Sequence, residues 1–393
     1  MRILFIAPYV PSRIRVRPFH FIKELAQRHS IHVAALGEHT KAGSDELAEL
    51  VEQFHIAPHS RLRGMLQSLM ALPTPTPLCA AYCWSPAMRN YLRKLVAAEK
   101  FDVVHIEHLR AAHFSDICGQ TPVVFDSVDC LTGLFGQMRY SKRNPVGRLL
   151  MMEEHFKLKR YEPQTLSSFQ RVVITSDSER RELVSLNQSL NIDVIPNGVD
   201  TDYFAPLKSQ KMQHRIVFSG KMGYHPNSQA AAWFATNVFP AIKKRFADAE
   251  FVIVGSDPPS HILKLQDVPG ITVTGFVDDI RPFLDSSTVA VVPMQVAVGV
   301  QNKILEAMAM ALPVVATSIS TRPLGPDCPG VVQADGISDM IDGVSSLLDN
   351  PESAREIGRG GREKVVSDFS WKSSVARLEQ VYEEVIRDHQ NAI

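Results

Sequence analysis

The sequence predicts two α/β domains, each built on a parallel sheet with helices on both faces. Short apolar strands alternate with helical segments along most of the chain, and continuous apolar strands are typical of a sheet buried on both sides. The alternation stops at the turn at 196–206 and the polar connector at 207–214, and then starts again. The length of 393 residues also fits about two domains. We therefore place the domains at 1–200 and 201–370.

The individual elements follow from apolar runs and helical spacing. In the first domain we expect helices near 18–28, 44–53, 85–98 and 146–168, and strands at 2–8, 32–36, 102–108, 122–128, 171–176 and 192–197. The strands expected in the second domain are 215–220, 250–255, 271–277, 289–294, 313–317 and 330–335. The last segment, 371–393, carries an apolar stripe and predicts a long helix that packs back on the first domain. Ligands are expected at the carboxyl ends of the strands, in a cleft between the domains.

Composition excludes several classes of protein. The net charge is zero, which argues against a nucleic-acid binder, since such proteins carry a basic excess. The five cysteines include no CxxC pair, so we expect free thiols in a reducing compartment and no metal site. Residues 1–10 are too short for a signal peptide or a membrane span, and no other apolar run reaches the length of a spanning helix. The expected location is cytoplasmic.

The stretch 299–317, GVQNKILEAMAMALPVVAT, predicts a helix that begins near residue 301 or 302 and ends before Pro313. Lys303 and Glu306 stand among its apolar residues and have two interpretations. They are either solvated helix charges, or part of a loop and helix start that hold phosphate oxygens with free backbone amides and one ammonium. The helix alone does not separate these alternatives.

Other strand-end loops carry further cations. The loop after the strand at 215–220 reads SGKMG, where Gly220 permits close approach of a ligand and Lys221 adds a charge that suits a diphosphate. The first loop lacks the glycines of a dinucleotide fingerprint and instead carries Arg13, Arg15 and Arg17 ahead of a helix. These arginines are either surface charges or a site for an anionic acceptor. No D-x-D arrangement for a metal ion follows a strand.

Several motifs together resemble one family. From VVITSDSERREL through IPNGVDTDYFAP, FSGKMGYHPN, FVIVGSD, VTGFVDDIRPFLDSSTVAVVPM and the stretch 299–317, the chain resembles the nucleotide-sugar glycosyltransferases of family 4. It is similar to the bacterial sugar transferases of exopolysaccharide or cell-surface glycan synthesis. The resemblance implies a GT-B architecture of two Rossmann-like domains, with the donor on the second and the acceptor on the first. It also implies retention of anomeric configuration without a metal ion or cofactor.

The resemblance assigns roles to matching positions in this sequence. Glu306 would bind the ribose hydroxyls, and the main chain of Val277 would lie beside the base. Lys221, Lys303 and Glu306 are the candidate catalytic residues. The residues expected to line the donor are Gly220, Val277, Gly299, Gln301, Asn302, Lys303 and Glu306.

The chain also departs from the family pattern. Many relatives have a second glutamate where Val298 stands, glycine where Ala311 stands, and histidine at Val128. Alanine at 311 is tolerable if the backbone avoids positive φ. The acceptor-side candidates are therefore polar residues near strand ends and in the first loop: Arg13, Arg15, Glu107, His108, Asp126 and Asp129.

Segments 61–72 and 144–162 mix Leu and Met with Arg and Lys. Packing of the apolar residues in the core is the favoured interpretation, and peripheral contact with the inner face of an anionic membrane is the alternative.

The function predicted from the sequence is a hexosyltransferase. It would move a hexose or N-acetylhexosamine from a UDP- or GDP-sugar to a hydroxyl of a glycan, lipid-linked or small-molecule acceptor, without a nucleic-acid partner. The alternatives are a GT-B nucleotide-sugar epimerase and a non-enzymatic two-domain sugar-binding protein.

Overall fold

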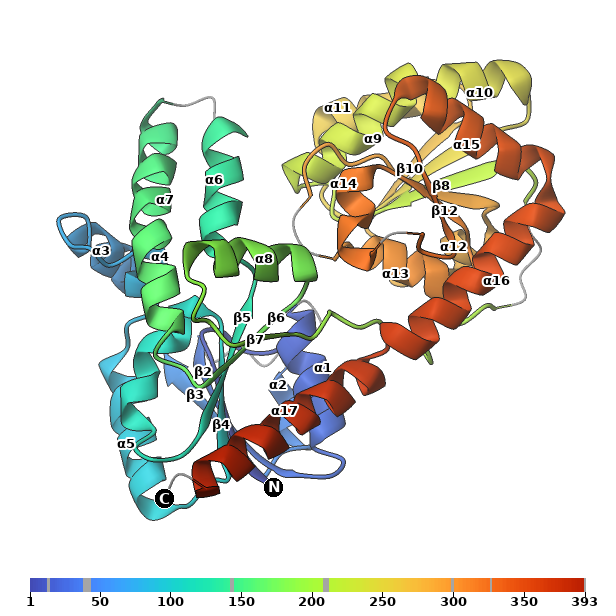
Figure 1. Ribbon diagram of the computed structural model, residues 1–393. Helices are drawn as coiled ribbons and strands as arrows, with labels where there is room; N and C mark the ends of the chain where they lie inside the picture. The colour runs from blue at the N-terminus through green and yellow to red at the C-terminus, as the bar shows by residue number, and fades with distance from the viewer. Residues whose placement is uncertain are drawn as a thin grey trace. The chain divides into compact units, whose positions relative to one another are not determined.

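The computed structural model describes residues 1–12, 15–37, 44–141, 145–207, 212–297, 300–325 and 327–391. The chain forms two compact units (Figure 1). Unit 1 comprises Met1–Pro196 and Ser374–Ile393, and unit 2 comprises Asn197–Ser373. Each unit holds one parallel sheet with helices packed around it, so the predicted fold class is confirmed. No helix among the described residues is long and apolar enough to cross a bilayer.

Unit 1 contains a seven-stranded sheet in the order β3-β2-β1-β4-β5-β6-β7, and every neighbouring pair is parallel. The order reverses between β1 and β4, which is the place where open α/β sheets bind ligands. The strands are β1 Arg2–Ala7, β2 Ser30–Gly37, β3 Gln53–Pro58, β4 Val103–Glu107, β5 Val123–Val128, β6 Arg171–Ile174 and β7 Ile192–Val194.

The helices of unit 1 cover both faces of this sheet (Figure 1). They are α1 Val16–Leu25, α2 Ser44–Ala48, α3 Arg61–Met70, α4 Leu78–Tyr82, α5 Pro86–Ala98, the 3₁₀ segment η1 Leu109–Ile117, α6 Leu131–Ser141, α7 Pro145–Leu166, α8 Asp177–Leu186 and α17 Trp371–Asn391. The stripe expected on the last helix is buried at Val375, Leu378 and Val385. Tyr382 is buried as well, and its hydroxyl lies 2.8 Å from Nδ1 of His105 on β4.

The prediction of a helix through 44–53 is wrong at its end. The helix α2 stops at Ala48, and Gln53 begins the edge strand β3. Five of the six residues of β3 are exposed or only partly buried, because an edge strand contacts the sheet on one side. A search for continuous apolar runs therefore passes over it.

The favoured interpretation of segment 61–72, packing of its Leu and Met in the core, is also wrong. These side chains on α3 are exposed, and several of those on α7 are exposed too. The only buried residue of α3 is Gly64.

Unit 2 contains a six-stranded parallel sheet in the order β10-β9-β8-β11-β12-β13, whose reversal lies between β8 and β11. All six strands agree with the sequence prediction. They are β8 Arg215–Ser219, β9 Glu250–Val254, β10 Ile271–Gly275, β11 Val289–Val292, β12 Val314–Ala316 and β13 Val331–Gln333. The helices are α9 His225–Asn237, α10 Phe239–Arg245, α11 Ser260–Leu263, η2 Lys264–Asp267, α12 Arg281–Ser286, α13 Asn302–Ala309, α14 Ser318–Thr321, η3 Arg322–Leu324, α15 Ile337–Asp349 and α16 Pro351–Asp368.

The carboxyl end of α13 closes in a Schellman motif. The amide of Leu312 donates to the carbonyl of Ala307, and the amide of Ala311 donates to the carbonyl of Met308. Ala311 has φ of 52°, so the condition for a tolerable alanine at this position is not met, and a β-carbon stands where glycine would be unstrained. A β-carbon added to Gly358 of α16 would come within 2.2 Å of the Ala311 carbonyl oxygen, so this glycine lets α16 pack directly on the turn.

Candidate functional site

The sheet of unit 2 opens at its carboxyl edge between β8 and β11. The chain leaves β8 through Gly220, whose φ is 151° and whose amide donates to the carbonyl of Val254. A β-carbon added to Gly255 would meet the Gly220 carbonyl oxygen at 1.8 Å, so the loops after β8 and β9 approach at a distance only glycine permits. A β-carbon on Gly220 would lie 3.3 Å from Cε of Lys303. The predicted donor residues Gly220 and Lys303 are thus neighbours.

Lys303 lies in the first turn of α13, and its hydrogen-bond partners in the described part of the chain are neutral. Its ammonium donates to Oδ1 of Asn227 at 2.9 Å and to Oε1 of Gln301 at 3.5 Å. Among the described residues, no carboxylate lies within ion-pair distance of Nζ. The cation therefore stands beside the backbone amides of a helix start, and the Glu306 carboxylate acts on it only from beyond ion-pair distance. This arrangement attracts an anion.

Burial shifts the titration of both charged residues on α13. It lowers the pKa of Lys303 to about 8, against the opposing effect of the Glu306 carboxylate. It raises the pKa of Glu306 to about 7, against the opposing effect of Lys303. A bound anion would favour the charged ammonium and move the Lys303 pKa upward again.

Asn227 is a residue of this site that sequence reasoning missed. It is buried in the first turn of α9, and its Nδ2 donates to the carbonyl of Lys221 while its Oδ1 accepts from Lys303. It thereby joins the loop after β8 to α13. The signal was its position, seven residues after Gly220 at a strand end, but its partners depend on the tertiary fold. Another polar atom, Oδ1 of Asn302, is buried here and has no hydrogen-bond partner among the described residues.

Among the described residues, the remaining candidate donor-binding residues are not hydrogen-bond partners of the Lys303 ammonium. Lys221 is exposed, and its ammonium lies 3.3 Å from the Asp257 carboxylate, so its charge is partly neutralised. Val277 follows the edge strand β10 at the same carboxyl edge and is partly buried against the core. Gly299 and the departure at Val298 lie outside the described residues.

The carboxyl edge of unit 1 holds a second polar cluster, between β1 and β4. The Tyr9 hydroxyl donates to Oε1 of Glu107 at 2.9 Å, and the Arg15 guanidinium lies 4.4 Å from the centre of the Tyr9 ring. Oε2 of Glu107 is buried without a hydrogen-bond partner in the described structure. Burial, reinforced by Asp126, raises the pKa of Glu107 to about 8, so the carboxyl is largely protonated at neutral pH. Arg13 lies outside the described residues.

Asp126 and Arg17 form a buried ion pair. Nε of Arg17 lies 2.7 Å from Oδ2 of Asp126, and neither side chain is appreciably exposed. Arg17 also donates to the carbonyl of Ile195. The expectation of Arg17 as a surface charge or acceptor contact is therefore wrong, because the first turn of α1 turns it inward. The Asp126 carboxylate is likewise engaged, since Oδ1 accepts from the amide of Val128.

Two strained residues flank this cluster. His108 and Val128 have φ of 68° and 64°, values that side chains with a β-carbon rarely adopt. Nδ1 of His108 accepts from the amide of Arg110, and burial lowers the His108 pKa to about 3, so this ring stays neutral. Asp129 follows Val128 and is partly buried, and burial with the Glu179 carboxylate raises its pKa to about 7.

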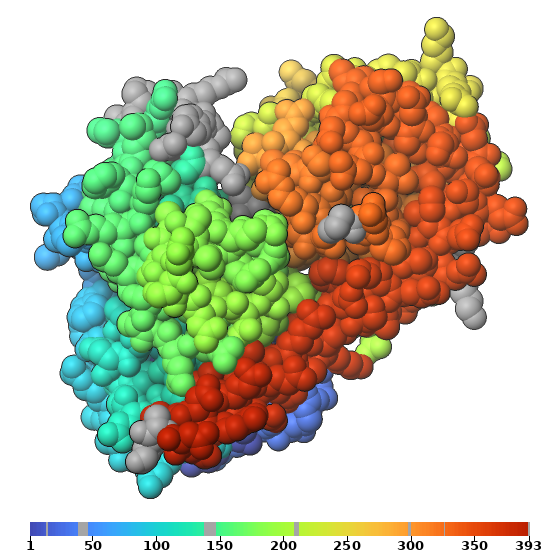
Figure 2. All heavy atoms as spheres, viewed as in Figure 1, coloured from blue at the N-terminus to red at the C-terminus, as the bar shows by residue number. Residues whose placement is uncertain are grey.

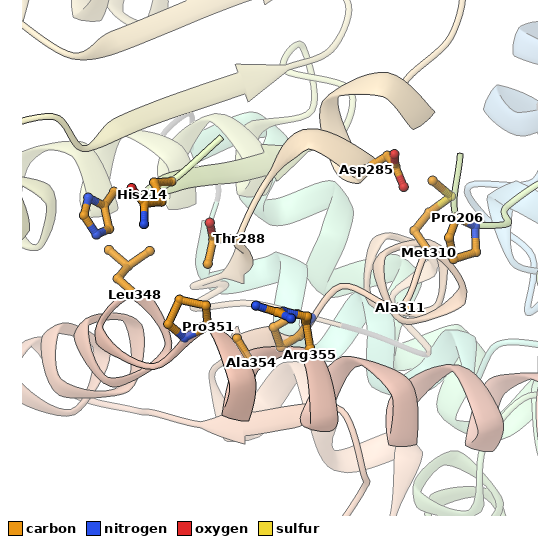
Figure 3. Close-up of a pocket in the computed structure, with 12 residues that line it drawn as sticks. Pro206, His214, Asp285, Thr288, Met310, Ala311, Leu348, Pro351, Ala354 and Arg355 are labelled. Atoms are coloured by element: carbon orange, nitrogen blue, oxygen red, sulfur yellow. The ribbon is translucent and has the colours of Figure 1, made fainter. Parts of the chain in front are cut away.

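A cavity of about 580 Å³ lies at the opposite edge of the unit 2 sheet (Figure 3). It borders the amino ends of β8, β11 and β12 at His214, Thr288 and Pro313, and contains none of the predicted donor residues. Among the residues that the structure describes, no group of three or more His, Cys, Asp or Glu side chains is placed to hold a metal ion.

Two family descriptions match the chain. "Glycosyltransferase Family 4" matches residues 16–203, and "Glycosyl transferases group 1" matches residues 213–350. The first match lies mostly in unit 1 and the second lies in unit 2.

Characterised relatives are distant and mostly matched in part. The MMP α-(1→4)-mannosyltransferase of Mycolicibacterium hassiacum is 28% identical over 208 residues, which are 50% of this chain and 49% of the relative. The chain thus spans about half the length of this curated relative. The UDP-Gal:α-D-GlcNAc-diphosphoundecaprenol α-1,3-galactosyltransferase of Escherichia coli is 23% identical over 373 residues, covering 85% of this chain and 90% of that protein.

A solved structure has the same fold over nearly the whole chain. The Anabaena HepE protein in complex with UDP superimposes with a TM-score of 0.70 at 13% identity, covering 98% of this chain and 100% of that one. At this identity the similarity concerns the fold alone.

Proposed function

Because the chain belongs to the group 1 and family 4 glycosyltransferases of the GT-B fold, we propose that it transfers a hexose or N-acetylhexosamine from a UDP- or GDP-sugar to an acceptor hydroxyl. The anomeric configuration is retained, no metal ion is needed, and the product belongs to surface glycan or exopolysaccharide synthesis. Relatives support a hexosyl group: one is named a mannosyltransferase and another a galactosyltransferase. The acceptor is a glycan, a lipid-linked sugar or a small molecule.

The observation that carries this proposal is the ammonium of Lys303 at the start of α13, beside Gly220, which has no ion-pair partner among the described residues. A diphosphate placed there meets a cation and helix amides, and the adjacent glycine leaves room for its oxygens. Asn227 holds the ammonium at the sheet edge before the ligand arrives, which reduces the reorganisation needed on binding. Glu306 lies one turn further along α13, where its carboxylate accepts hydrogen bonds from the ribose hydroxyls.

The chemical step needs charge stabilisation more than a protein base. The acceptor oxygen forms a bond to the anomeric carbon on the face that the diphosphate leaves. The bond from that carbon to the phosphate oxygen breaks, and its electron pair goes to the diphosphate. A phosphate oxygen takes the acceptor proton. Lys303, with Lys221 as a weaker contributor, stabilises the charge that develops on the leaving group.

On the acceptor side we assign Arg15, Glu107 and Asp129, which lie at the carboxyl edge of the unit 1 sheet. The protonated carboxyl of Glu107 offers both a donor and an acceptor of hydrogen bonds to a sugar hydroxyl. Asp126 and His108 act indirectly, the first by fixing Arg17 and the second by capping η1.

Thermal stabilisation by candidate donors is the first test. UDP-, GDP- and ADP-sugars are screened, and a true donor present at 100 times its dissociation constant should add about 2.7 kcal/mol to the unfolding free energy. Activity with the selected donor should persist in EDTA, and the anomeric proton coupling of the product should match that of the donor. Absence of stabilisation by any of these nucleotides contradicts the proposal, whereas an inverted product contradicts retention alone. Epimer formed without acceptor would instead identify an epimerase.

A further inference from the structure

The helix α3 of unit 1 turns its large apolar side chains away from the protein. Leu62, Met65, Leu66, Leu69 and Met70 are each between 53% and 75% exposed. At 100° per residue these five positions fall on one face of the helix. Soluble proteins rarely leave so many adjacent Leu and Met side chains in water, so this face is a surface with a partner.

The opposite face of α3 attaches the helix to the rest of unit 1 through small and polar groups. A β-carbon on Gly64 would come within 2.5 Å of the Tyr82 ring, so the helix lies directly on that ring. Nε2 of Gln67 donates to the Trp84 carbonyl, and the Ser68 hydroxyl donates to the Leu78 carbonyl. The orientation is therefore fixed by specific contacts, and the exposed apolar face is part of the fold.

The chain segment that contains α3 is basic, although the α7 carboxylates Glu153 and Glu154 lie near the end of the helix. Residues 53–98 contain no Asp or Glu, but they include Arg61, Arg63, Arg89, Arg93 and Lys94. Arg61 and Arg63 lie about 100° to either side of Leu62 on the helix, at the two borders of the apolar face. Basic residues that border an apolar stripe are typical of helices that lie in an anionic membrane surface.

The apolar surface continues beyond α3. The Lys157 ammonium donates to the carbonyls of Ala71 and Leu72, which ties α7 to the end of α3, and the preceding residue Phe156 is highly exposed. A cavity of about 380 Å³ between Met70 and the exposed Trp84 adds further apolar lining. In Figure 2 the helix α3 forms the blue protrusion at the left edge of unit 1.

We propose that α3 docks unit 1 onto an anionic phospholipid bilayer. The helix is about 15 Å long and therefore lies in the plane of the surface, with Leu62, Leu66 and Leu69 in the acyl boundary and the two arginines among the headgroups. The inference goes beyond the proposed transfer reaction and does not depend on the identity of the donor.

A second copy of this chain fits the face less well. In a two-fold interface the same patch meets itself, so Arg61 and Arg63 of both copies would face one another without a carboxylate from the segment 53–98 to neutralise them. An anionic bilayer supplies opposite charge at this border.

Vesicle flotation tests the docking. The full chain is mixed with vesicles of phosphatidylcholine alone or with added phosphatidylglycerol, and we expect it to float with the anionic vesicles and less with neutral ones. The triple variant Leu62→Gln, Leu66→Gln and Leu69→Gln should lower the partition coefficient at least about tenfold. A control variant of three unit 2 residues that are each 44% exposed, Leu263→Gln, Ile337→Gln and Val366→Gln, should float as the wild type.

A second variant, Arg61→Gln with Arg63→Gln, should also lower flotation, and salt should weaken binding of the wild type. Retained nucleotide binding shows that a variant is folded. The proposal is overturned if the wild type does not float, if the triple variant floats like the wild type, or if the wild type is a dimer in solution that the triple variant converts to a monomer. Should the triple variant unfold, the arginine variant carries the test, and its undiminished flotation overturns the proposal.

Discussion

The two sheets share the same strand order at their reversal points, yet the cations at these points differ. In unit 1, Arg17 is neutralised inside the protein by Asp126 and donates to a carbonyl of the same unit. In unit 2, Lys303 has only the neutral oxygens of Asn227 and Gln301 as hydrogen-bond partners among the described residues. A cation that the fold neutralises supports the structure, whereas a cation held by neutral groups remains available to an anion.

This difference predicts that substitutions at the Arg17–Asp126 pair lower stability, whereas substitution of Lys303 weakens ligand binding. Removing either partner of the buried pair leaves an uncompensated charge, whereas removing Lys303 breaks no ion pair among the described residues and only weakens the stabilisation of the Glu306 carboxylate. The substitutions below test this difference, from the largest expected effect to the smallest.

Replacing Asp126 with Ala should lower the unfolding free energy by about 3–5 kcal/mol, because the Arg17 guanidinium stays buried without its counter-charge. Urea unfolding at neutral pH measures the loss. As a control, Glu384→Ala removes one partner from the exposed pair with Arg171 and should cost less than about 1 kcal/mol. Equal losses of unfolding free energy in the two variants would show that the buried pair contributes no more to stability than the exposed pair.

Glu107→Gln tests a buried carboxyl of unit 1 whose Oε2 has no hydrogen-bond partner among the described residues. Burial raises the pKa of this acid in the folded state from its ordinary value of 4.5 to about 8, so its stabilising contribution is complete below pH 4.5 and is lost as pH rises toward 8. Glutamine does not titrate. The stability of the variant relative to the wild type should therefore rise by about 2–4 kcal/mol between pH 5 and pH 8.5. Unfolding midpoints at both pH values check this, and a constant difference would contradict it.

Lys303→Ala should weaken UDP or GDP binding by about 1.5–3 kcal/mol and lower turnover, while the unfolding free energy changes by less than about 1 kcal/mol. Calorimetric titration and urea unfolding measure the two effects. Lys221→Ala is the matched control, with a smaller loss because that ammonium is exposed and paired with Asp257. If Lys303→Ala destabilises as Asp126→Ala does, the proposed difference between the two cations is wrong.

Glu306→Ala should weaken binding of the nucleoside diphosphate by about 1–2 kcal/mol, since the ribose hydroxyls lose their acceptor. Inorganic pyrophosphate has no ribose, so its affinity should stay unchanged in this variant and fall in Lys303→Ala. Competition titrations with both ligands separate the two roles. Equal loss for pyrophosphate and nucleotide would remove the ribose assignment.

Ala311→Gly acts at the other end of α13. Glycine relieves the positive φ at this position and should raise the unfolding free energy by about 0.5–1 kcal/mol, with nucleotide affinity unchanged. Melting curves measure the change in stability, and calorimetric titration measures the nucleotide affinity. Altered affinity would indicate that the carboxyl end of α13, and not only its start, takes part in binding.

Much of the fold was predictable, because apolar-rich segments that alternate with helices identify twelve of the thirteen strands that the structure describes. The exception, β3, is a partly exposed edge strand without such a run. The apolar face of α3 was misassigned for a related reason, since helical spacing shows that a face exists but not whether it meets the core or a partner.

The candidate site was predictable only to the level of loops. Strand ends located Gly220, Lys303 and Glu306 at one edge of one sheet. Which partner each side chain takes depends on the fold, as Asn227 beside Lys303 and Asp126 beside Arg17 illustrate. Local pattern therefore locates a cation, and tertiary contacts decide whether it is free to bind.

A crystal structure of the chain with UDP or GDP tests the central claim most directly. We predict diphosphate oxygens within hydrogen-bond distance of the Lys303 ammonium and of the first amides of α13, with the Glu306 carboxylate on the ribose hydroxyls. A nucleotide bound elsewhere, such as in the cavity beside His214 and Arg355, would contradict the account.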